Sequence, residues 1–262
     1  MQSLRGQRVL LVNDDGIDAP GIRVLEEVVR EFTDDVWVVA PDDERSGAAR
    51  SLSITVPVRV RQVDDRHFAV RGTPTDCVVL AYHELMQDRP PDVLLSGINR
   101  GANLGEDVSY SGTAAAAMEG LTLGMKSVAL SLVFTFGSEK YWDTARRHCP
   151  AVLDFLLGQP WPDARFYNVN FPDCPPDEVS GMRITRQGNR PPGSFIPERR
   201  IDGRDVPYYW IKLNYRDGEM QDGTDLTAVY HKAVSITPMH LDQTDYALRD
   251  RLAEQLGAGS AG

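Results

Sequence analysis

The first half of the chain alternates short apolar segments with segments whose apolar residues recur at helical spacing. Residues 8–12 (RVLLV) and 36–40 (VWVVA) are mostly apolar and rich in β-branched side chains, as buried strands are. Between them, the apolar residues of 21–32 recur every three or four positions, which is typical of an amphipathic helix. Strands that alternate with helices form parallel sheets covered on both faces. We therefore predict an α/β fold with a mostly parallel sheet.

The alternation continues along the chain and becomes less regular in the second half. Residues 54–61 alternate apolar with mostly polar side chains, which is typical of a half-buried strand, and 67–70 is the expected hairpin partner. Residues 97–111 are rich in Gly and Asn and are expected to form a long loop. Further strands are expected at 92–96, 127–132, 165–170, 182–186 and 233–237, and further helices from Thr73 to about Met86 and at 112–123, 141–157, 224–230 and 245–256.

The region after residue 185 departs from this pattern. Residues 186–200 (RQGNRPPGSFIPERR) are rich in Pro, Gly and Arg and are flanked by strand-like segments. One of these, 205–214, carries three consecutive aromatic residues at 208–210. The pattern indicates a β-arm at about 190–215, and such arms often pair with another subunit. The final GAGSAG is expected to be a frayed tail.

Composition limits the classes of function. The 262 residues include 28 Lys and Arg against 38 Asp and Glu, so the formal net charge is −10, which disfavours a nucleic-acid polymer as partner. No apolar run approaches the roughly 20 residues that cross a membrane. Three cysteines without a CxxC pair and no recognisable signal peptide favour the reducing cytoplasm.

Polar side chains follow three of the predicted strands, where each strand ends. In an open parallel sheet the carboxyl ends of the strands meet at one edge, which is where such sheets bind ligands. We therefore expect these residues to gather at that edge: Asn13, Asp14, Asp15 and Gly16 after the first strand, Ser46 after the second, and Asn99, Asn103, Ser109, Ser111 and Thr113 after the strand at 92–96.

Asp14 and Asp15 carry like charges side by side, so each raises the pKa of the other. A hard divalent cation such as Mg²⁺ removes this cost, because it prefers oxygen ligands from one or two carboxylates. Asn and Ser oxygens can complete the shell, whereas the His and Cys ligands of zinc sites do not occur in these loops. Taken alone, NDDG is equally a turn with a helix cap.

Ser111, Gly112 and Thr113 stand at the predicted start of a helix. The free N–H groups, the hydroxyls and the helix dipole favour phosphate there, although Ser and Thr at such a position also serve as ordinary caps. The chain contains neither a Walker A loop nor GxGxxG. A metal beside a phosphate cradle points to hydrolysis of a phosphate ester by metal-activated water.

Five stretches of the chain resemble the survival protein SurE family of 5′/3′-nucleotidases: VNDDGIDAPGI, VAPDDERSGAARSLS, GTPTDCV, PDVLLSGINRGANLGEDVSYSGTAAAAMEG and VSITPMHLDQT. The resemblance covers residues 8 to 245. It implies a Rossmann-like, three-layer core with a C-terminal extension, and divalent-metal-dependent hydrolysis of nucleoside 5′-monophosphates, with action on 3′-nucleotides or short polyphosphate in some relatives.

The resemblance also implies roles for individual residues. One Mg²⁺ or Mn²⁺ per subunit would be held by Asp14, Asp15, Ser46 and Asn99, the two aspartates being the catalytic residues. Phosphate would be held by Asn103, Ser111, Gly112 and Thr113. Arg100 departs from the family pattern, because many relatives have His in GINHG.

At the level of organisation, the resemblance implies one domain over 1–262. A core of about 7–135 with 140–187 precedes a β-arm and exchanged C-terminal region of about 188–256 and the tail 257–262. Relatives form dimers or tetramers by exchanging the arm and the C-terminal segment.

Two other functions remain open at this point. The chain could be a metal-dependent nucleotide-binding or sensor module without turnover, although the ligand set is intact. It could also be a nucleoside hydrolase that uses the same aspartates on a ribose, although such sites carry a denser run of aspartates (DxDxxxDD) that is absent here.

Overall fold

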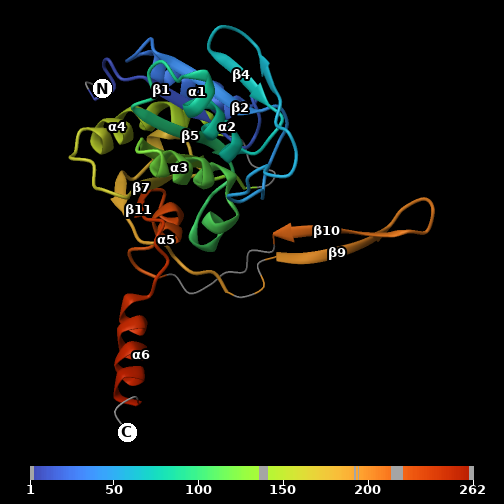
Figure 1. Ribbon diagram of the computed structural model, residues 1–262, viewed down its shortest axis with the longest axis vertical. Coiled ribbons are helices and arrows are strands. Elements are labelled where there is room, and N and C mark those ends of the chain that lie inside the picture. Colours follow the sequence, from blue (N-terminus) through green and yellow to red (C-terminus); the bar gives the residue numbers. More distant parts are fainter. Residues whose placement is uncertain (1–2, 136–140, 192, 194, 214–220, 260–262) are drawn as a thin grey trace.

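The structure, a computed structural model, describes residues 3–135, 141–191, 193, 195–213 and 221–259 of the 262-residue chain. Its centre is a nine-stranded sheet of order β3-β4-β2-β1-β5-β6-β7-β11-β8 (Figure 1). Among the described pairs of this sheet, only β3/β4 and β7/β11 are antiparallel, which confirms a mostly parallel sheet. The strands are β1 (Val9–Val12), β2 (Val36–Pro41), β3 (Val60–Gln62), β4 (His67–Val70), β5 (Val93–Arg100), β6 (Lys126–Leu132), β7 (Phe166–Phe171), β8 (Met182–Ile184) and β11 (Val234–Met239).

Helices connect the strands and cover the sheet (Figure 1). None of the helices in the described ranges is long and apolar enough to cross a membrane. The α-helices are α1 (Pro20–Arg30), α2 (Pro74–Leu80), α3 (Gly112–Thr122), α4 (Trp142–Leu157), α5 (Asp225–Tyr230) and α6 (Tyr246–Gly259), with a π-helical turn η1 (Ala81–Leu85) and 3₁₀ turns η2 (Gly105–Tyr110) and η3 (Pro176–Glu178).

The side chains of β1 show why the protein has three layers. Successive side chains of a strand point to opposite faces of the sheet. Val9 and Leu11 belong to the core cluster that includes α1 and α4, whereas Leu10 and Val12 belong to the cluster that includes α2 and α3. All four are fully buried. The strand is therefore apolar throughout because both of its faces are covered, which confirms the predicted α/β class.

The three cysteines are buried, and two of them belong to these core clusters. Cys77 on α2 and Cys149 on α4 are fully buried, and Cys174 is 2% exposed. Burial raises the pKa of Cys149 to about 12. A thiol with such a pKa stays protonated at neutral pH and contributes as a small apolar side chain.

The strand order contains a switch point beside β1. From β1 the chain passes to β2 and β4 on one side and then resumes with β5 on the other side. β1 is parallel to both β2 and β5, so the loops that leave β1 and β5 diverge at the carboxyl edge. Such a divergence leaves a crevice in which open α/β sheets bind their ligands.

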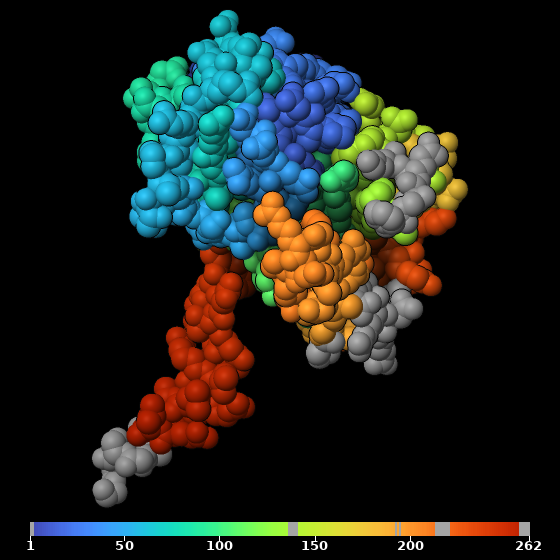
Figure 2. Space-filling model, turned by 90° about the vertical axis from the view of Figure 1, so that its right-hand side faces the viewer, coloured from blue at the N-terminus to red at the C-terminus, as the bar shows by residue number. Residues whose placement is uncertain are grey.

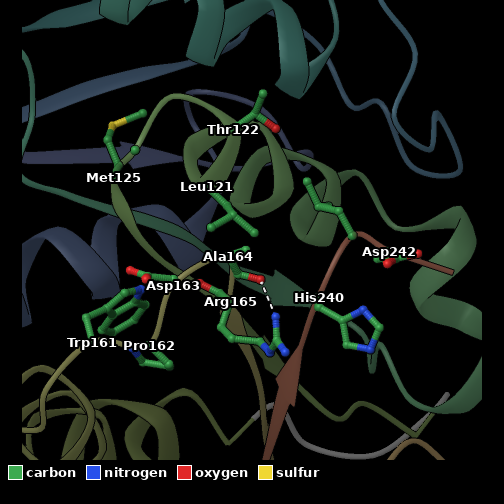
Figure 3. A pocket seen from close by; sticks show the side chains of 12 residues that line it. Leu121, Thr122, Met125, Trp161, Pro162, Asp163, Ala164, Arg165, His240 and Asp242 are labelled. Atoms are coloured by element: carbon green, nitrogen blue, oxygen red, sulfur yellow. Dashed lines mark hydrogen bonds between the residues drawn. The ribbon is translucent and has the colours of Figure 1, made fainter. Parts of the chain in front are cut away.

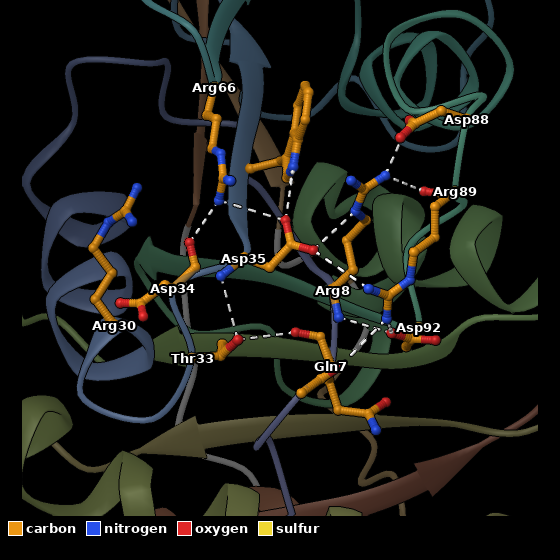
Figure 4. A network of polar contacts seen from close by, with 12 residues as sticks. Gln7, Arg8, Arg30, Thr33, Asp34, Asp35, Arg66, Asp88, Arg89 and Asp92 are labelled. Atoms are coloured by element: carbon orange, nitrogen blue, oxygen red, sulfur yellow. Dashed lines mark hydrogen bonds and ion pairs between the residues drawn. The ribbon is translucent and has the colours of Figure 1, made fainter.

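The opposite edge of the sheet is held by a polar network (Figure 4). Arg8 precedes β1, Asp35 precedes β2 and Asp92 precedes β5. Arg8 donates from Nε to Asp35 (3.1 Å) and from its backbone N–H to Asp92 (2.7 Å). The side chain of Arg8 is only 11% exposed, so solvent screens these bonds less than it screens surface ion pairs. The network fixes the starts of three neighbouring strands.

Two elements project from the globule. β9 (Phe195–Ile201) and β10 (Pro207–Leu213) form an antiparallel hairpin, which confirms the predicted arm. Of the predicted strand 205–214, residue 214 lies outside the described residues. α6 extends away from the globule in another direction (Figures 1 and 2). α6 continues through Gly259, so it includes the first three residues of the predicted tail 257–262. Residues 260–262 lie outside the described residues.

The predicted strand at 54–61 is largely wrong. Only Val60–Gln62 pairs with β4, and the residues before it are not in a strand. Ile54 is 85% exposed and Val56 is 59% exposed. Pro57 interrupts the segment and has no backbone N–H for a ladder. Of the alternating apolar residues at 54, 56, 58 and 60, Val58 alone packs against the core.

The predicted loop at 97–111 is also shorter than expected. β5 does not end at residue 96 but continues to Arg100, after a register irregularity between Ser96 and Asn99. Gly97 makes this course possible, because a Cβ there would lie 2.2 Å from the carbonyl oxygen of Leu130 on β6. Residues 105–110 form the turn η2.

His67 links β4 to α1 and predicts a pH dependence of stability. Burial lowers its pKa, but hydrogen bonds to Asp64 and Glu26 outweigh burial, so the pKa is raised above its usual value near 6.5. The stabilisation is complete below about pH 6.5 and is lost as pH rises through the raised pKa. As pH rises through the raised pKa of His67, the free energy of unfolding of wild type should fall by up to about 1 kcal/mol more than that of His67→Gln. Urea denaturation at a series of pH values measures this difference.

The matched control is His83→Gln, which alters an exposed histidine on η1. It should keep the pH dependence of wild type. Identical pH profiles for wild type and His67→Gln would contradict the role given to His67.

Candidate active site at the carboxyl edge of the sheet

Asp14 lies just past the end of β1 and is 4% exposed. Its Oδ1 accepts a hydrogen bond of 2.6 Å from the hydroxyl of Thr113, in the first turn of α3. Asn13 closes the turn between β1 and α1. Its side chain donates to the carbonyl of Gly16 and accepts from the N–H of Gly16. The turn and the carboxylate are thus separate features of NDDG: Asn13 builds the turn, and Asp14 faces α3.

Gly112 allows Asp14 and α3 to come this close. A Cβ on Gly112 would lie 2.8 Å from Cβ of Asp14 and 2.9 Å from its Oδ2. No real Cβ tolerates such distances, so the site requires glycine for steric reasons. The sequence suggested that Gly112 serves a phosphate, and the structure adds that it makes room for a carboxylate.

The charge of Asp14 is poorly compensated by the protein alone. Burial raises the pKa of Asp14 to about 6; the hydrogen bond from Thr113 counteracts this in part, and the charge of Asp15 adds to it. A buried carboxylate is stabilised by a cation beside it. These two aspartates therefore fit a divalent ion.

Asp15 and Asn99 approach the same place from β1 and β5. Oδ2 of Asp15 accepts a hydrogen bond of 2.9 Å from the backbone N–H of Arg100. Asn99 donates from Nδ2 to the carbonyl of Gly101 (2.8 Å), which uses its amide nitrogen and fixes the side chain. The amide oxygen, the atom that Mg²⁺ prefers, is not used in this bond.

Ser46 belongs to a loop that is joined to the strand end. The backbone N–H of Arg45 donates to the carbonyl oxygen of Asp14 at 2.7 Å. The hydroxyl of Ser46 is exposed and donates to Glu44 (2.9 Å). Glu44 also lies 3.8 Å from the guanidinium of Arg100. The loop is thus close to Asp14, while the Ser46 hydroxyl is engaged by a neighbouring carboxylate.

Asn103 is 6% exposed and is held by polar residues that the sequence analysis did not identify. Its Nδ2 donates to Ser131 on β6 (2.7 Å), and its N–H donates to Asn170 on β7 (2.9 Å). Asn168 and Asn170 both donate to its carbonyl. A signal was present, because two asparagines at alternate positions interrupt an otherwise apolar strand. These contacts hold the loop after β5 at the carboxyl edge.

The start of α3 presents backbone N–H groups and side-chain caps. Ser111 is the N-cap and accepts a hydrogen bond of 3.0 Å from the N–H of Ala114. The hydroxyls of Ser111 and Thr113 are thus both engaged within the protein. The positive end of the helix dipole and the N–H groups of the first turn provide the attraction for an anion.

Asp225 connects this edge to the root of the arm and was also missed. It is fully buried at the start of α5. It accepts hydrogen bonds of 2.9 Å from the N–H groups of Gly105 and Gly188. Because Gly105 opens η2 and Gly188 precedes the arm, one carboxylate fixes the arm root against the candidate site.

A cavity of about 520 Å³ lies elsewhere, between the end of α3, the start of β7 and the end of β11 (Figure 3). Trp161, Arg165 and His240 are among the residues that line it. Met125 and Arg165 immediately precede β6 and β7, so the cavity lies at the amino edge of the sheet. The candidate site is at the opposite edge, where Asp14 and Thr113 meet.

The donor set has the composition of an oxygen site. Within the described ranges, no group of three or more His, Cys, Asp and Glu side chains could hold a metal ion. The set at the carboxyl edge has two carboxylates, with the amide of Asn99 at the end of β5 and the hydroxyl of Ser46 on the loop after β2. This chemistry fits a hard divalent cation that keeps open positions for water or phosphate.

An open parallel sheet with two carboxylates and a helix N-terminus at its switch point defines a class of α/β proteins that bind ligands at the carboxyl ends of the strands. Comparison with known proteins identifies the family within this class. The model of the family described as Survival protein SurE matches residues 9–193. The chain belongs to the SurE family.

Relatives match almost the whole chain. A protein named 5′-nucleotidase SurE from Chelativorans sp. (strain BNC1) is 51% identical over 252 residues, which cover 95% of this chain and 99% of that protein. The protein of the same name from Parvibaculum lavamentivorans is 48% identical, with 95% and 91% covered. The crystal structure of the SurE protein from Aquifex aeolicus superposes with a TM-score of 0.80 at 38% identity, covering 94% of this chain and 98% of that one.

The contact between Gly112 and Asp14 predicts the effect of a methyl group. Gly112→Ala should displace Asp14, and overpacking of this kind costs about 1–3 kcal/mol. We expect Mn²⁺ affinity, measured by isothermal titration calorimetry, to fall by about tenfold or more.

Gly203→Ala is the control, because nothing lies within 4 Å of a Cβ at that position and its φ is not positive. It should bind Mn²⁺ as wild type does. Equal affinities for the two variants would show that Gly112 does not set the position of a ligand.

Proposed function

We propose that this chain is a metal-dependent nucleotidase that hydrolyses nucleoside 5′-monophosphates to nucleoside and inorganic phosphate. The observation that carries the proposal is the buried Asp14, which meets the first turn of α3 through Thr113 at 2.6 Å. A carboxylate pair and a helix N-terminus thereby stand side by side, as a metal and a phosphate require. The name 5′-nucleotidase SurE, carried by relatives that match over almost their whole length, supports the substrate class.

In this proposal Asp14, Asp15, Ser46 and Asn99 hold one Mg²⁺ or Mn²⁺ ion. When bound, the ion supplies a Lewis acid that offsets charge on the phosphoryl group. Thr113 keeps Asp14 oriented through its hydrogen bond, and the N–H of Arg100 does the same for Asp15. To act as a ligand, the Ser46 hydroxyl would have to give up its hydrogen bond to Glu44.

The phosphate lies at the N-terminus of α3. The N–H groups of the first turn donate hydrogen bonds to its oxygens, and Ser111 and Asn103 are assigned to the same phosphate. Asp14 is buried, whereas Asp15 is partly exposed. We therefore assign Asp14 to holding the ion, and Asp15 both to holding the ion and to contact with the reacting phosphate and its proton. The proposed metal ligands and the first turn of α3 contact the phosphate and not the rest of the substrate. We therefore include 3′-monophosphates and short polyphosphate as substrates.

Release of inorganic phosphate from AMP tests the proposal. Wild type should require Mg²⁺ or Mn²⁺ and lose activity in EDTA. Asp14→Asn should lower kcat/KM by about 10³-fold or more, because a metal contributes several kcal/mol of charge stabilisation. Asp18→Asn is the control, since the side chain of Asp18 is 88% exposed and pairs with Arg23 on α1. It should retain wild-type activity.

Other outcomes separate the alternatives. Metal-dependent binding of AMP without phosphate release would favour a sensor module. Release of free base would favour a nucleoside hydrolase. Full activity of Asp14→Asn would contradict the assigned site.

We also propose that the protein forms a homodimer or homotetramer through the arm and α6. Trp210 and Ile211 on β10 are 55% and 68% exposed, and Leu252 and Leu256 on α6 are 48% and 78% exposed. Exposed apolar groups on projecting elements are typical of subunit contacts. In solution, Trp210→Asp with Ile211→Asp should lower the mass measured by light scattering, while Arg204→Asp in the hairpin turn should not. An unchanged mass in the double variant would contradict this role.

A further inference from the structure

We propose that Tyr110 and Phe195 form an aromatic platform that stacks on the nucleobase of the substrate. The two rings meet edge to face, with centroids 4.9 Å apart and an interplanar angle of 62°. Both remain open to solvent, Tyr110 being 51% exposed and Phe195 41% exposed. The inference rests on the proposed function and extends it from the phosphate to the base.

The position of Tyr110 in the chain ties the platform to the site. Tyr110 ends η2 and directly precedes Ser111, the N-cap of α3. Its carbonyl oxygen accepts a hydrogen bond of 3.2 Å from the N–H of Ala49, three residues beyond Ser46. The backbone of Tyr110 is therefore held between the helix that would bind phosphate and the loop that would contribute a metal ligand.

Phe195 is brought to this place by the root of the arm. The N–H of Arg190 donates to Glu106 on η2 (2.9 Å), and its guanidinium pairs with Asp107 (3.0 Å). The side chains of Arg190 and Asp107 are only 14% and 10% exposed. These bonds join η2 to the arm root a few residues before each of the two rings. Figures 1 and 2 both show the arm leaving the globule beside the loops that follow β2.

This placement fits a nucleotide in particular. A 5′-phosphate is joined to its base through a ribose, so the base lies a short distance from the phosphate. With the phosphate at the α3 N-terminus, the base would meet Tyr110 and Phe195. Stacking on aromatic side chains is tolerant of base identity because every base has a π-face. Platforms that are already fixed before binding lose little conformational entropy on binding. The arm root would then contribute to substrate selection as well as to assembly.

Ribose 5-phosphate provides the comparison substrate, because it has the sugar and the phosphate ester but no base. Wild type should favour AMP over ribose 5-phosphate in kcat/KM by about tenfold or more. In Tyr110→Leu and in Phe195→Leu this preference should fall by about five- to tenfold, mainly through KM for AMP. Tyr110→Phe keeps the ring and should keep the preference.

Tyr230→Leu is the matched control, because Tyr230 is a 68% exposed tyrosine at the end of α5. It should leave the preference unchanged. The thermal melting temperature and mass of each variant are measured alongside, so that unfolding or a change of assembly is recognised. If Tyr110→Leu does not fold, the wild-type preference and the Phe195→Leu variant still decide the matter.

The outcomes separate this inference from the function on which it rests. Equal kcat/KM of wild type for both substrates, or an unchanged preference in folded Leu variants, overturns the platform while leaving the nucleotidase intact. Equal losses on both substrates overturn it as well, because they indicate a structural role. A wild type that releases phosphate from neither substrate contradicts the proposed function itself.

Discussion

The burial of the Asp14 carboxylate is the constraint on which the carboxyl edge of the sheet depends. A buried charge is costly unless donors or a cation compensate it, and here the protein supplies a hydroxyl from Thr113 while the adjacent Asp15 adds a like charge. The same contact joins β1 to the start of α3, and it exists only because Gly112 lacks a side chain. One local contact therefore links the sheet, the helix proposed to bind phosphate and the proposed cation.

The topology makes this contact useful. Because β1 lies at the switch point, the loops after β1 and β5 separate and leave the strand ends accessible. The loop after β5 is fastened by Asn103 to strands β6 and β7, and its continuation is fastened to the arm root by Asp225. Buried polar groups whose hydrogen bonds are satisfied can hold loops as firmly as apolar packing does. The arm is thereby attached to the candidate site as well as to the globule.

The sequence predicted the class of fold and the edge of the sheet that carries the polar residues, because periodicity and strand-end position are local properties. It did not predict that the Thr113 hydroxyl turns to Asp14, since that bond joins residues 99 positions apart in the chain. Nor did it single out Asn168 and Asn170. At 54–61 the sequence predicted a strand that is largely absent. Alternation of apolar residues does not show whether the rest of the protein covers them, and Ile54 is exposed. The four metal ligands and the phosphate contacts stay predictions.

The location of a bound ion tests the central claim most directly. Crystals grown with Mn²⁺ and measured at a wavelength where manganese scatters anomalously would locate the ion without reference to activity. We expect one strong anomalous peak per subunit, surrounded by oxygens of Asp14, Asp15, Ser46 and Asn99, at the N-terminal side of α3. A peak at another place, or none at this edge in crystals that contain Mn²⁺, would contradict the account of why two carboxylates end β1.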